Sequence, residues 1–322
     1  LSETDLWWNF QSKIRANGGR VALLSGKLSK RSAKNYKTFS FFSTRLFGSI
    51  DAFGVQTQQY AELFEWAGVD RKKIKVTGNL KFDDHYTVLS EGEKKVWRGE
   101  LGIRQGDPVI VFGSSHPQEE ELFLRQMREV WKRKPRVKVI IVPRHPERFD
   151  EVSSILERFK LMYARYTDVE AKPISGNEQV LLLDVMGVLR KAYQIADLAI
   201  IAGSFTSSVG GHNILEPAYY GVPAIFGPFM YAQEEMKTLV LSNQAGLQVA
   251  VNELEKVLLR FFREPLKFKE MGKRGLKLST DLKGSLHKTY CFLEKDLALF
   301  LNRSHLFHLQ NQLMLFELHY LH

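Results

Sequence analysis

Short continuous apolar runs alternate with segments of helical spacing over most of the chain. In the second part of the sequence, seven apolar runs predict buried parallel strands at 109–112, 137–142, 161–166, 180–183, 198–202, 224–226 and 247–251. Segments with apolar residues at helical spacing separate most of these runs. Strands that alternate with helices are typical of a parallel sheet covered on both faces, with ligands bound at the carboxyl ends of the strands.

The first part of the chain shows the same alternation. Its pattern predicts helices at 3–17, 36–49 and 58–68 and strands at 20–25, 52–56 and 74–77. Residues 84–91 are polar and show no periodicity, so we place an interdomain linker there. The sequence therefore predicts two α/β domains, at 1–86 and 87–296, followed by an atypical tail at 297–322.

Length and composition agree with two domains. A chain of 322 residues, of which 44% are hydrophobic, is long enough to bury two medium-sized cores. The single cysteine, Cys291, excludes an internal disulfide, and its apolar neighbours predict a core position. No apolar run reaches the roughly 20 residues that span a bilayer. The sequence has no initiator methionine and opens within a βα repeat, so we expect the first domain to be incomplete at its N-terminus.

Positive charge is concentrated near the start of the chain. The net charge is +10, and the first 50 residues contain Glu3 and Asp5 as their acidic residues against nine basic ones. These are Lys13, Arg15, Arg20, Lys27, Lys30, Arg31, Lys34, Lys37 and Arg45. Such a surface attracts phosphates of nucleic acid, lipid headgroups or a phosphorylated sugar, and it is equally typical of a solvated surface. No nucleic-acid-binding signature accompanies it, so we expect no nucleic acid partner.

A glycine-rich stretch from Gly203 to Pro228 has the order of a phosphate-binding element. An apolar strand at 196–202 precedes Gly210-Gly211-His212-Asn213, and a helix that contains Glu216 is expected to follow. Backbone N–H groups at a helix N-terminus suit an anion. Glu216 has two interpretations: it complements the helix dipole, or it accepts hydrogen bonds from the hydroxyls of a sugar.

Three more polar segments follow predicted strands, at 113–116, 143–148 and 184–187. Ser114 and Ser115 either cap the helix that begins near residue 117 or contact a ligand. Arg144 either binds an anion or is solvated at a strand end. His145 and His212 are either hydrogen-bond donors to a ligand or structural histidines, and neither has metal-ligand spacing. Because parallel strands end at one edge of the sheet, these segments are expected to converge there.

Five motifs occur in order along the chain. They are Ser2-Glu3-Thr4-Asp5-Leu6-Trp7, Val76-Thr77-Gly78-Asn79-Leu80-Lys81-Phe82-Asp83, Gly113-Ser114-Ser115-His116 with Glu119-Glu120, Pro143-Arg144-His145-Pro146-Glu147-Arg148, and Gly210-Gly211-His212-Asn213-Ile214-Leu215-Glu216-Pro217. Together they resemble the motifs of bacterial 3-deoxy-D-manno-octulosonic acid (Kdo) transferases. The resemblance implies a GT-B glycosyltransferase fold with two Rossmann-like domains. It also implies inverting, metal-independent transfer of Kdo from CMP-Kdo to the phosphorylated lipid A precursor, lipid IVA, in lipopolysaccharide core biosynthesis.

The resemblance assigns candidate site residues and a location. The implied CMP site consists of Pro143, Arg144, Met186, Gly211, His212, Asn213 and Glu216, and the implied donor-sugar pocket of Ser114, Ser115, His116 and His145. On the acceptor side the matching residues are Glu3, Lys27, Arg31 and Lys81. The implied location is the cytoplasmic face of the bacterial inner membrane, and no cofactor or metal is implied. A catalytically silent relative that binds a nucleotide or anionic lipid, and a GT-B transferase that uses a UDP-sugar, are the alternatives.

The sequence departs from the family pattern in three places. The family's general base is a glutamate in a Ser-x-Gly-Glu segment that follows a short membrane anchor, and neither is present in these residues. We therefore expect no catalytic base here and expect the chain to bind donor better than it turns over. Val188 replaces a usual glutamate, and the tail, which contains His305, His308, His319 and His322, does not resemble the family's ending.

Overall fold

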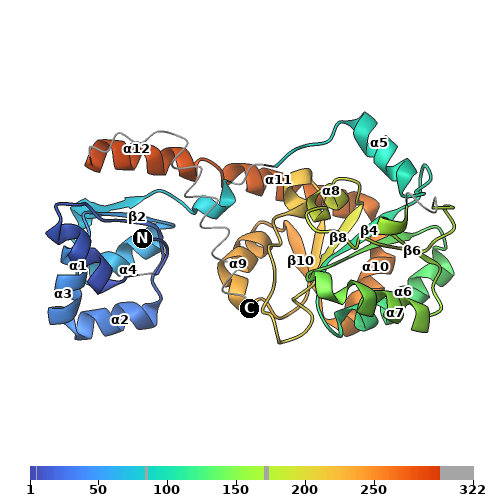
Figure 1. The fold of residues 1–322 in the computed structure, drawn as a ribbon, viewed down its shortest axis with the longest axis horizontal. Helices are drawn as coiled ribbons and strands as arrows, with labels where there is room; N and C mark the ends of the chain where they lie inside the picture. The colour runs from blue at the N-terminus through green and yellow to red at the C-terminus, as the bar shows by residue number, and fades with distance from the viewer. Residues whose placement is uncertain (5, 84–85, 170–173, 298–322) are drawn as a thin grey trace. The chain divides into compact units, whose positions relative to one another are not determined.

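The computed structural model describes residues 1–4, 6–83, 86–169 and 174–297. These residues form two compact units: unit 1 contains residues 1–83 and 282–297, and unit 2 contains residues 86–281. Each unit is an α/β structure built on a parallel sheet (Figure 1). No helix among the described residues is both long and apolar enough to cross a membrane.

Unit 1 is built on three parallel strands in the order β1 (Ala22–Gly26), β2 (Ala52–Val55) and β3 (Ile74–Val76). Its helices are α1 (Trp8–Ala16), α2 (Lys30–Thr38), α3 (Ser40–Gly48), α4 (Gln58–Trp66) and α12 (Ser285–Leu297). Leu23 and Phe53 point to one face of the sheet, where they pack with residues of α2, α3 and α4. Leu24 and Ala52 point to the other face, as the alternation along a strand requires.

Two features of unit 1 differ from the expected helices. The single helix predicted at 36–49 is two helices. Capped by Ser29, α2 begins at Lys30, six residues before the predicted start, and Phe39 leaves the helical conformation. The hydroxyl of Ser43 donates to the carbonyl of Tyr36 at 2.8 Å and satisfies it at this break. The helix predicted from residue 3 begins only at Trp8, because Glu3 has a positive φ of 52°.

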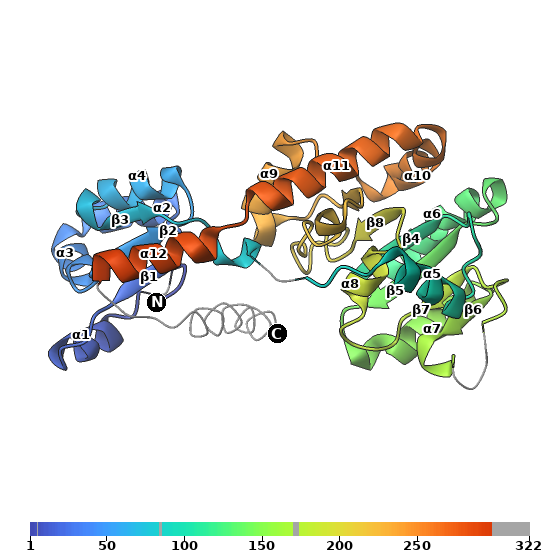
Figure 2. The same ribbon diagram turned by 90° about the horizontal axis from the view of Figure 1, so that it is seen from above.

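Helix α12 lies against the sheet of unit 1 (Figure 2). Its residues Phe292 and Leu293 belong to the same buried cluster as Leu24. The carboxylate of Asp83 accepts hydrogen bonds from the backbone N–H groups of Gly284 and Leu286, which fixes the start of this helix. This placement differs from the expected second domain at 87–296, because helical spacing shows an apolar face but not the sheet that it covers. Cys291 on the same helix is exposed, so the predicted core position is wrong. Except for Leu297, the expected tail lies outside the described residues.

Unit 2 contains a seven-stranded parallel sheet in the order β10-β9-β8-β4-β5-β7-β6. The strands are β4 (Val109–Ser115), β5 (Lys138–Pro143), β6 (Tyr163–Arg165), β7 (Val180–Leu182), β8 (Leu198–Ile201), β9 (Ala224–Phe226) and β10 (Gly246–Gln248). Each of the seven predicted strands corresponds to one of them. The α-helices are α5 (Glu91–Glu100), α6 (Glu119–Arg133), α7 (Phe149–Arg158), α8 (Leu189–Tyr193), α9 (Glu234–Ser242), α10 (Leu254–Arg263) and α11 (Pro265–Asp281).

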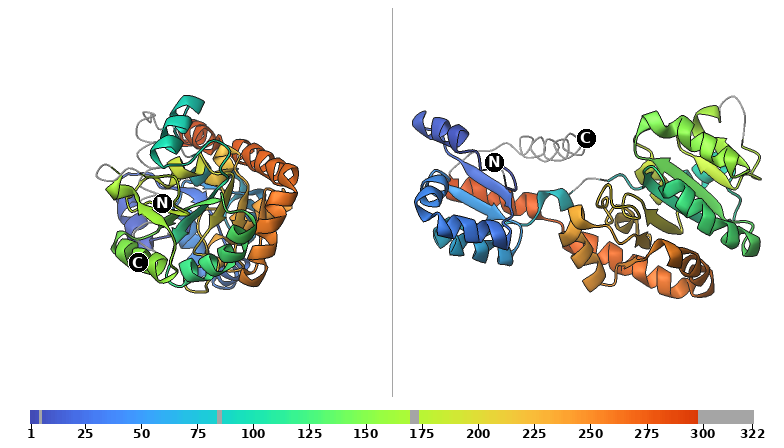
Figure 3. Two further views of the ribbon diagram at one scale, coloured as in Figure 1. Left: turned by 90° about the vertical axis from the view of Figure 1, so that its right-hand side faces the viewer. Right: turned by 90° about the horizontal axis from the view of Figure 1, so that it is seen from below.

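Short 3₁₀ helices complete the described fold. They are η1 (Arg71–Lys73), η2 (Leu80–Phe82), η3 (Pro146–Arg148), η4 (Tyr166–Asp168), η5 (Pro217–Tyr220), η6 (Tyr231–Gln233) and η7 (Val251–Glu253). The main core of unit 2 lies between its sheet and helices α6, α7 and α10, with the rings of Phe112 and Phe123 stacked at 4.4 Å. The blue helices of unit 1 and the green helices of unit 2 can be followed from two further directions in Figure 3.

The order of strands in unit 2 reverses direction at one point of the sheet. Strand β4 is central and pairs with β5 on one side and with β8 on the other. The chain proceeds from β4 toward β5 and from β8 toward β9, in opposite directions. In open α/β sheets, ligands bind outside the carboxyl ends of strands at such a switch point. The segments that follow β4 and β8 are therefore the first place to look for a site.

The helix expected after the glycine-rich loop is absent from its predicted place. A turn at 214–216 leads into η5, which is only four residues long. Gly221, with a φ of +71°, ends this element. An anion site based on the dipole of a long helix is therefore wrong here, and side chains must supply most of the positive charge.

Candidate functional site

The carboxylate of Glu119 joins the loops that follow β4 and β8. It accepts hydrogen bonds from the backbone N–H groups of His116 at 3.1 Å, Gly203 at 2.7 Å and Phe205 at 2.9 Å. The residue is only 1% exposed. Burial raises the pKa of Glu119, and the three N–H groups act in the opposite direction. One side chain thus fixes the spacing of the two loops at the switch point.

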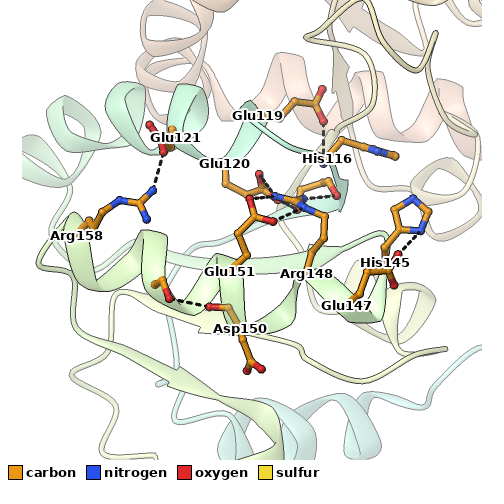
Figure 4. Close-up of polar contacts among 12 residues, drawn as sticks. His116, Glu119, Glu120, Glu121, His145, Glu147, Arg148, Asp150, Glu151 and Arg158 are labelled. Atoms are coloured by element: carbon orange, nitrogen blue, oxygen red, sulfur yellow. Dashed lines mark hydrogen bonds and ion pairs between the residues drawn. The ribbon is translucent and has the colours of Figure 1, made fainter.

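A second buried network joins the end of β5 to α6 (Figure 4). Arg148 donates to both carboxylate oxygens of Glu120, at 2.6 and 3.2 Å, and also to the carboxylate of Glu151. Ser115 donates its hydroxyl to Glu120 at 2.7 Å. The side chains of Arg148 and Glu120 are 7% and 0% exposed. This bidentate pair holds the segment after β5 against the segment after β4.

Three histidines, His116, His145 and His212, lie in contact with one another at the same strand ends. The Nε2 atoms of His116 and His212 lie 2.7 Å apart, and their rings stack with centroids 5.0 Å apart. The ring of His145 meets that of His116 edge to face at 5.3 Å. A short Nε2 to Nε2 contact is a hydrogen bond only when one ring donates and the other accepts, so the geometry fits one shared proton.

Burial and neighbouring positive charge keep this histidine pair neutral. Burial is the larger cause and lowers the pKa of His116 to about 4 and that of His212 to about 3. His145 and Arg144 add to the effect on both rings. Gly203 is required beneath the pair, because a Cβ at this position would lie 2.6 Å from the ring of His212.

Arg144 carries an uncompensated positive charge beside the histidines. Its backbone N–H donates to the carbonyl of Ser115 at 3.0 Å, which positions it at the end of β5. Its side chain is partly buried, and within the described parts of the chain its guanidinium has no hydrogen bond or ion pair. A partly buried cation beside two neutral imidazoles is an arrangement suited to an anionic ligand. We refer to Arg144, His116, His145, His212 and Glu119 as the strand-end cluster.

Glu216 lies on the other side of the loop after β8. Its carboxylate is 3.5 Å from Arg190, and its side chain is 21% exposed. Glu216 and burial both raise the pKa of Tyr193, burial being the larger cause. The hydroxyl of Tyr193 packs on Gly113, where an added Cβ would lie 2.3 Å from it. Glu216 is therefore tied through α8 to the end of β4, with part of its carboxylate accessible.

The remaining predicted residues of unit 2 have other surroundings. Ser115 belongs to the buried Glu120 network, and the N-cap of α6 is Gln118, so neither predicted serine caps this helix. Ser114 has a φ of +57°, at the irregular end of β4. Met186 is 57% exposed. Pro143 ends β5. Gly211 donates its backbone N–H to the carbonyl of Gly203, and the side-chain oxygen of Asn213 accepts a hydrogen bond from the N–H of Leu215.

In unit 1, three of the four predicted acceptor-side residues meet. Glu3 forms ion pairs with Lys27, at 2.6 Å, and with Lys81. Burial opposes ionisation of Glu3, but the two lysines lower its pKa below the ordinary value. Arg31 is exposed on α2 and takes no part in this group. The end of β1 is joined to the turn at η2, because Leu80 donates its N–H to the hydroxyl of Ser25 at 3.1 Å.

The sequence did not indicate which buried residues hold the loops of the site in place. It predicted that Glu119 and Glu120 support the first turn of a helix, and it gave Arg148 only as one member of a motif. Tyr193 and Arg190 gave no signal. The sequence did offer one sign of the buried networks: Arg148 and the Glu119-Glu120 pair follow neighbouring predicted strands. Opposite charges beside buried strands commonly pair.

The chain is similar to known Kdo transferases. Residues 1–84 match the family described as 3-deoxy-D-manno-octulosonic-acid transferase (kdotransferase). The 3-deoxy-D-manno-octulosonic acid transferase of Chlamydophila psittaci is 34% identical over 82% of this chain and 60% of the relative. That of Haemophilus influenzae is 27% identical over 89% of this chain and 67% of the relative. The chain thus spans about three fifths of the length of the first of these relatives.

Solved structures support the same fold. The C-terminal CMP-Kdo binding domain of WaaA from Acinetobacter baumannii is 26% identical and covers 58% of this chain and 96% of that chain, with a TM-score of 0.54. HepE from Anabaena, in complex with UDP, is 15% identical over 91% of this chain and 76% of that chain, with a TM-score of 0.55, and shows the fold alone. The predicted GT-B fold is confirmed.

Proposed function

We propose, on its similarity to known Kdo transferases, that this chain is part of a glycosyltransferase of that family. The proposed reaction transfers Kdo from CMP-Kdo to the lipid A precursor, lipid IVA, in lipopolysaccharide core biosynthesis. The observation that carries the donor half of this proposal is the uncompensated Arg144 beside the His116–His212 pair, at the switch point of the unit 2 sheet. CMP-Kdo carries a phosphate and a carboxylate, and a partly buried arginine beside an imidazole N–H group suits such anions.

In the proposed donor complex, the residues of unit 2 divide the ligand between them. Arg144 binds the phosphate and stabilises the negative charge that grows on the departing CMP. One N–H of the neutral His116–His212 pair is used between the two rings, so we assign the remaining Nδ1–H of the accepting ring as a donor to the anionic groups. His145 is proposed as a further donor for the sugar. Glu216, which is held by Arg190 at 3.5 Å and partly accessible, accepts hydrogen bonds from the ribose hydroxyls. Pro143, Met186, Gly211 and Asn213 are proposed to complete the CMP site.

The acceptor half of the proposal concerns unit 1. Lys27 and Lys81 share the carboxylate of Glu3, and we assign these two cations to a phosphate of the phosphorylated sugar acceptor. Transfer is proposed to invert the anomeric configuration, without a metal ion, at the cytoplasmic face of the inner membrane. Arg144 supplies the positive charge that such a reaction needs at the leaving group. We assign no general base among these side chains.

Nucleotide binding tests the proposal most directly. CMP is expected to raise the melting temperature of the chain, and Glu216→Ala is expected to abolish that shift. Glu264→Ala is the matched control, because Glu264 forms an ion pair with Lys267 at 2.9 Å outside the strand-end cluster and should leave the shift unchanged. The absence of a shift with any cytidine nucleotide would overturn the proposal.

Two further measurements separate the alternatives. Preferential binding of UDP over CMP in a competition experiment would identify a transferase that uses a UDP-sugar instead. A relative without transferase activity would bind CMP but would fail to release it from CMP-Kdo in the presence of lipid IVA, even in the full-length protein.

A further inference from the structure

The buried face of α11 contains two glycines. The buried residues of this helix, which is orange in Figure 2, include Phe268, Gly272, Gly275 and Ser279. Their intervals of four, three and four residues place them on one face of the helix. Glycine inside a helix is less favourable than alanine, because it loses more conformational freedom on folding. Two glycines on the packed face therefore indicate that another segment approaches α11 closely.

The 3₁₀ helix η5 makes this close approach. A Cβ at Gly272 would lie 2.0 Å from the carbonyl oxygen of Gly221, the residue that ends η5. A Cβ at Gly275 would lie 3.1 Å from the Cβ of Ala218 within η5. Real Cβ atoms keep at least 3.0 Å from their neighbours. A methyl group added at Gly272 therefore requires a movement of about 1 Å, whereas one added at Gly275 requires only a few tenths of an ångström.

Helix α11 is fastened to the rest of unit 2 at other points. Phe268 is 2% exposed in the main core, and its ring meets that of Phe261 edge to face at 5.3 Å. Arg274 donates to the backbone carbonyl of Gln244 at 2.9 Å. In contrast, η5 is only four residues long. A methyl group added at Gly272 is therefore expected to displace η5 and to leave the helix in place.

The position of η5 determines where Glu216 lies. Glu216 immediately precedes η5, and the N–H of Tyr219 donates to the carbonyl of Leu215 at 3.2 Å, which joins the turn at 214–216 to η5. Hydrogen bonds between a hydroxyl and an oxygen acceptor span only about 2.5–3.0 Å. A displacement of about 1 Å therefore takes the carboxylate of Glu216 out of reach of a hydroxyl group that it otherwise binds.

We propose that Gly272 is a positioning residue that gives the nucleotide site its preference for a ribonucleotide. Gly272 lets η5 lie close to α11, and this placement brings the carboxylate of Glu216 within reach of the ribose hydroxyls. The role of Gly272 rests on the proposed function, which assigns Glu216 to the ribose. Gly272 itself contacts no ligand and acts only through η5.

Binding of two nucleotides, measured by isothermal titration calorimetry, tests this role. Dideoxy-CMP lacks both ribose hydroxyls, so the ratio of its dissociation constant to that of CMP reports the contact with Glu216. The parent chain is expected to bind CMP about 10- to 100-fold more tightly, because the hydroxyls donate to a carboxylate. Glu216→Ala should lower this ratio to about one, and Gly272→Ala should lower it by about fivefold or more.

The ratio separates positioning from a general loss of stability, which would weaken the binding of both nucleotides equally. Combining Gly272→Ala with Glu216→Ala should lower the ratio no further than Glu216→Ala alone, because the carboxylate that Gly272 positions is then absent. Gly99→Ala is the matched control, since Gly99 lies within α5 and an added Cβ would meet nothing within 4 Å. This variant should leave the ratio unchanged.

A second variant keeps the test decisive if Gly272→Ala folds poorly. Gly275→Ala requires a much smaller movement of η5 and should lower the ratio by about twofold to threefold. An unchanged ratio in a folded Gly272→Ala variant would overturn the role of Gly272. If that variant does not fold, an unchanged ratio in Gly275→Ala would overturn it.

Failure of the proposed function would look different. A parent chain that binds CMP and dideoxy-CMP equally would overturn the assignment of Glu216 to the ribose, and the role of Gly272 with it. A ratio that falls in Glu216→Ala but not in Gly272→Ala would overturn the role of Gly272 alone and leave the donor site as proposed.

Discussion

At the strand ends of unit 2, the carboxylates of Glu119 and Glu120 are almost fully buried, and protein groups satisfy both of them. The five basic residues of α2 and α3 in unit 1 are exposed and have no ion-pair partner among the described residues. They are Lys30, Arg31, Lys34, Lys37 and Arg45. Buried charges hold their surroundings in one geometry, because moving them would leave unpaired charge in a poorly solvated interior. Exposed side chains impose no such geometry, so we expect the first region to govern stability and the second to contribute little to it.

The largest expected effect comes from breaking the buried pair of unit 2. Arg148→Met leaves the carboxylate of Glu120 buried with only Ser115 as a side-chain partner, and should destabilise unit 2 by about 3–5 kcal/mol. Urea unfolding, with hydrogen exchange of α6 and α7 as the local readout, measures the change.

The matched control is Arg158→Met. Arg158 of α7 pairs with Glu121 of α6 at 2.8 Å, but the side chains are 58% and 37% exposed, so the loss should be about 0–1 kcal/mol. Both pairs appear in Figure 4. Equal losses in the two variants would refute the idea that burial makes this network important.

The sequence predicted the strands of both units and the convergence of Arg144, His116, His145 and His212, because apolar runs and strand ends are local signals. It did not predict that α12 packs on unit 1 or that Phe39 divides a helix. The partner of an apolar face depends on contacts distant in sequence, and the break depends on a serine cap outside the expected helix. The Glu119 and Arg148 networks were missed for the same reason, since a buried ion pair can be recognised only when both partners are placed.

The second prediction uses pH to test the buried histidines. The folded-state pKa values of His116 and His212, about 4 and about 3, lie below the ordinary value of 6.5, so the unfolded chain binds protons first. The stability they contribute is present above pH 6.5 and is lost as the pH falls toward 4, by about 1.4 kcal/mol per pH unit for each histidine. The melting temperature should therefore fall as the pH is lowered from 7 to 5.

The double variant His116→Asn and His212→Asn isolates this contribution. Its melting temperature should depend less on pH between 7 and 5 than that of the parent. Glu119, whose raised pKa acts with the opposite sign above pH 4.5, is present in both proteins and cancels in the comparison. An unchanged pH dependence in the double variant would show that the pair has ordinary pKa values. Saturating CMP should reduce the loss, because an anion favours the protonated imidazoles.

The third prediction concerns the uncompensated arginine of unit 2. Arg144→Ala should weaken CMP binding by about 10- to 100-fold, as expected for a charge-assisted contact with a phosphate. Arg144→Lys should recover only part of the affinity, because a lysine cannot reproduce the planar pair of donors. Isothermal titration calorimetry measures both. The stability of unit 2 should not fall in either variant, since the guanidinium has no hydrogen bond or ion pair among the described residues to lose.

The smallest expected effect is on the stability of unit 1. Phe42→Ser removes a ring that is 53% exposed and should change the free energy of unfolding by less than about 0.5 kcal/mol. Phe47→Ala, on the same helix, removes a ring that is 3% exposed and should cost about 3–5 kcal/mol. Calorimetric melting of the two variants compares the effect of removing an exposed phenylalanine with that of removing a buried one. A large loss for Phe42→Ser would mean that its ring supports the fold and that exposure is a poor guide to stability in this unit.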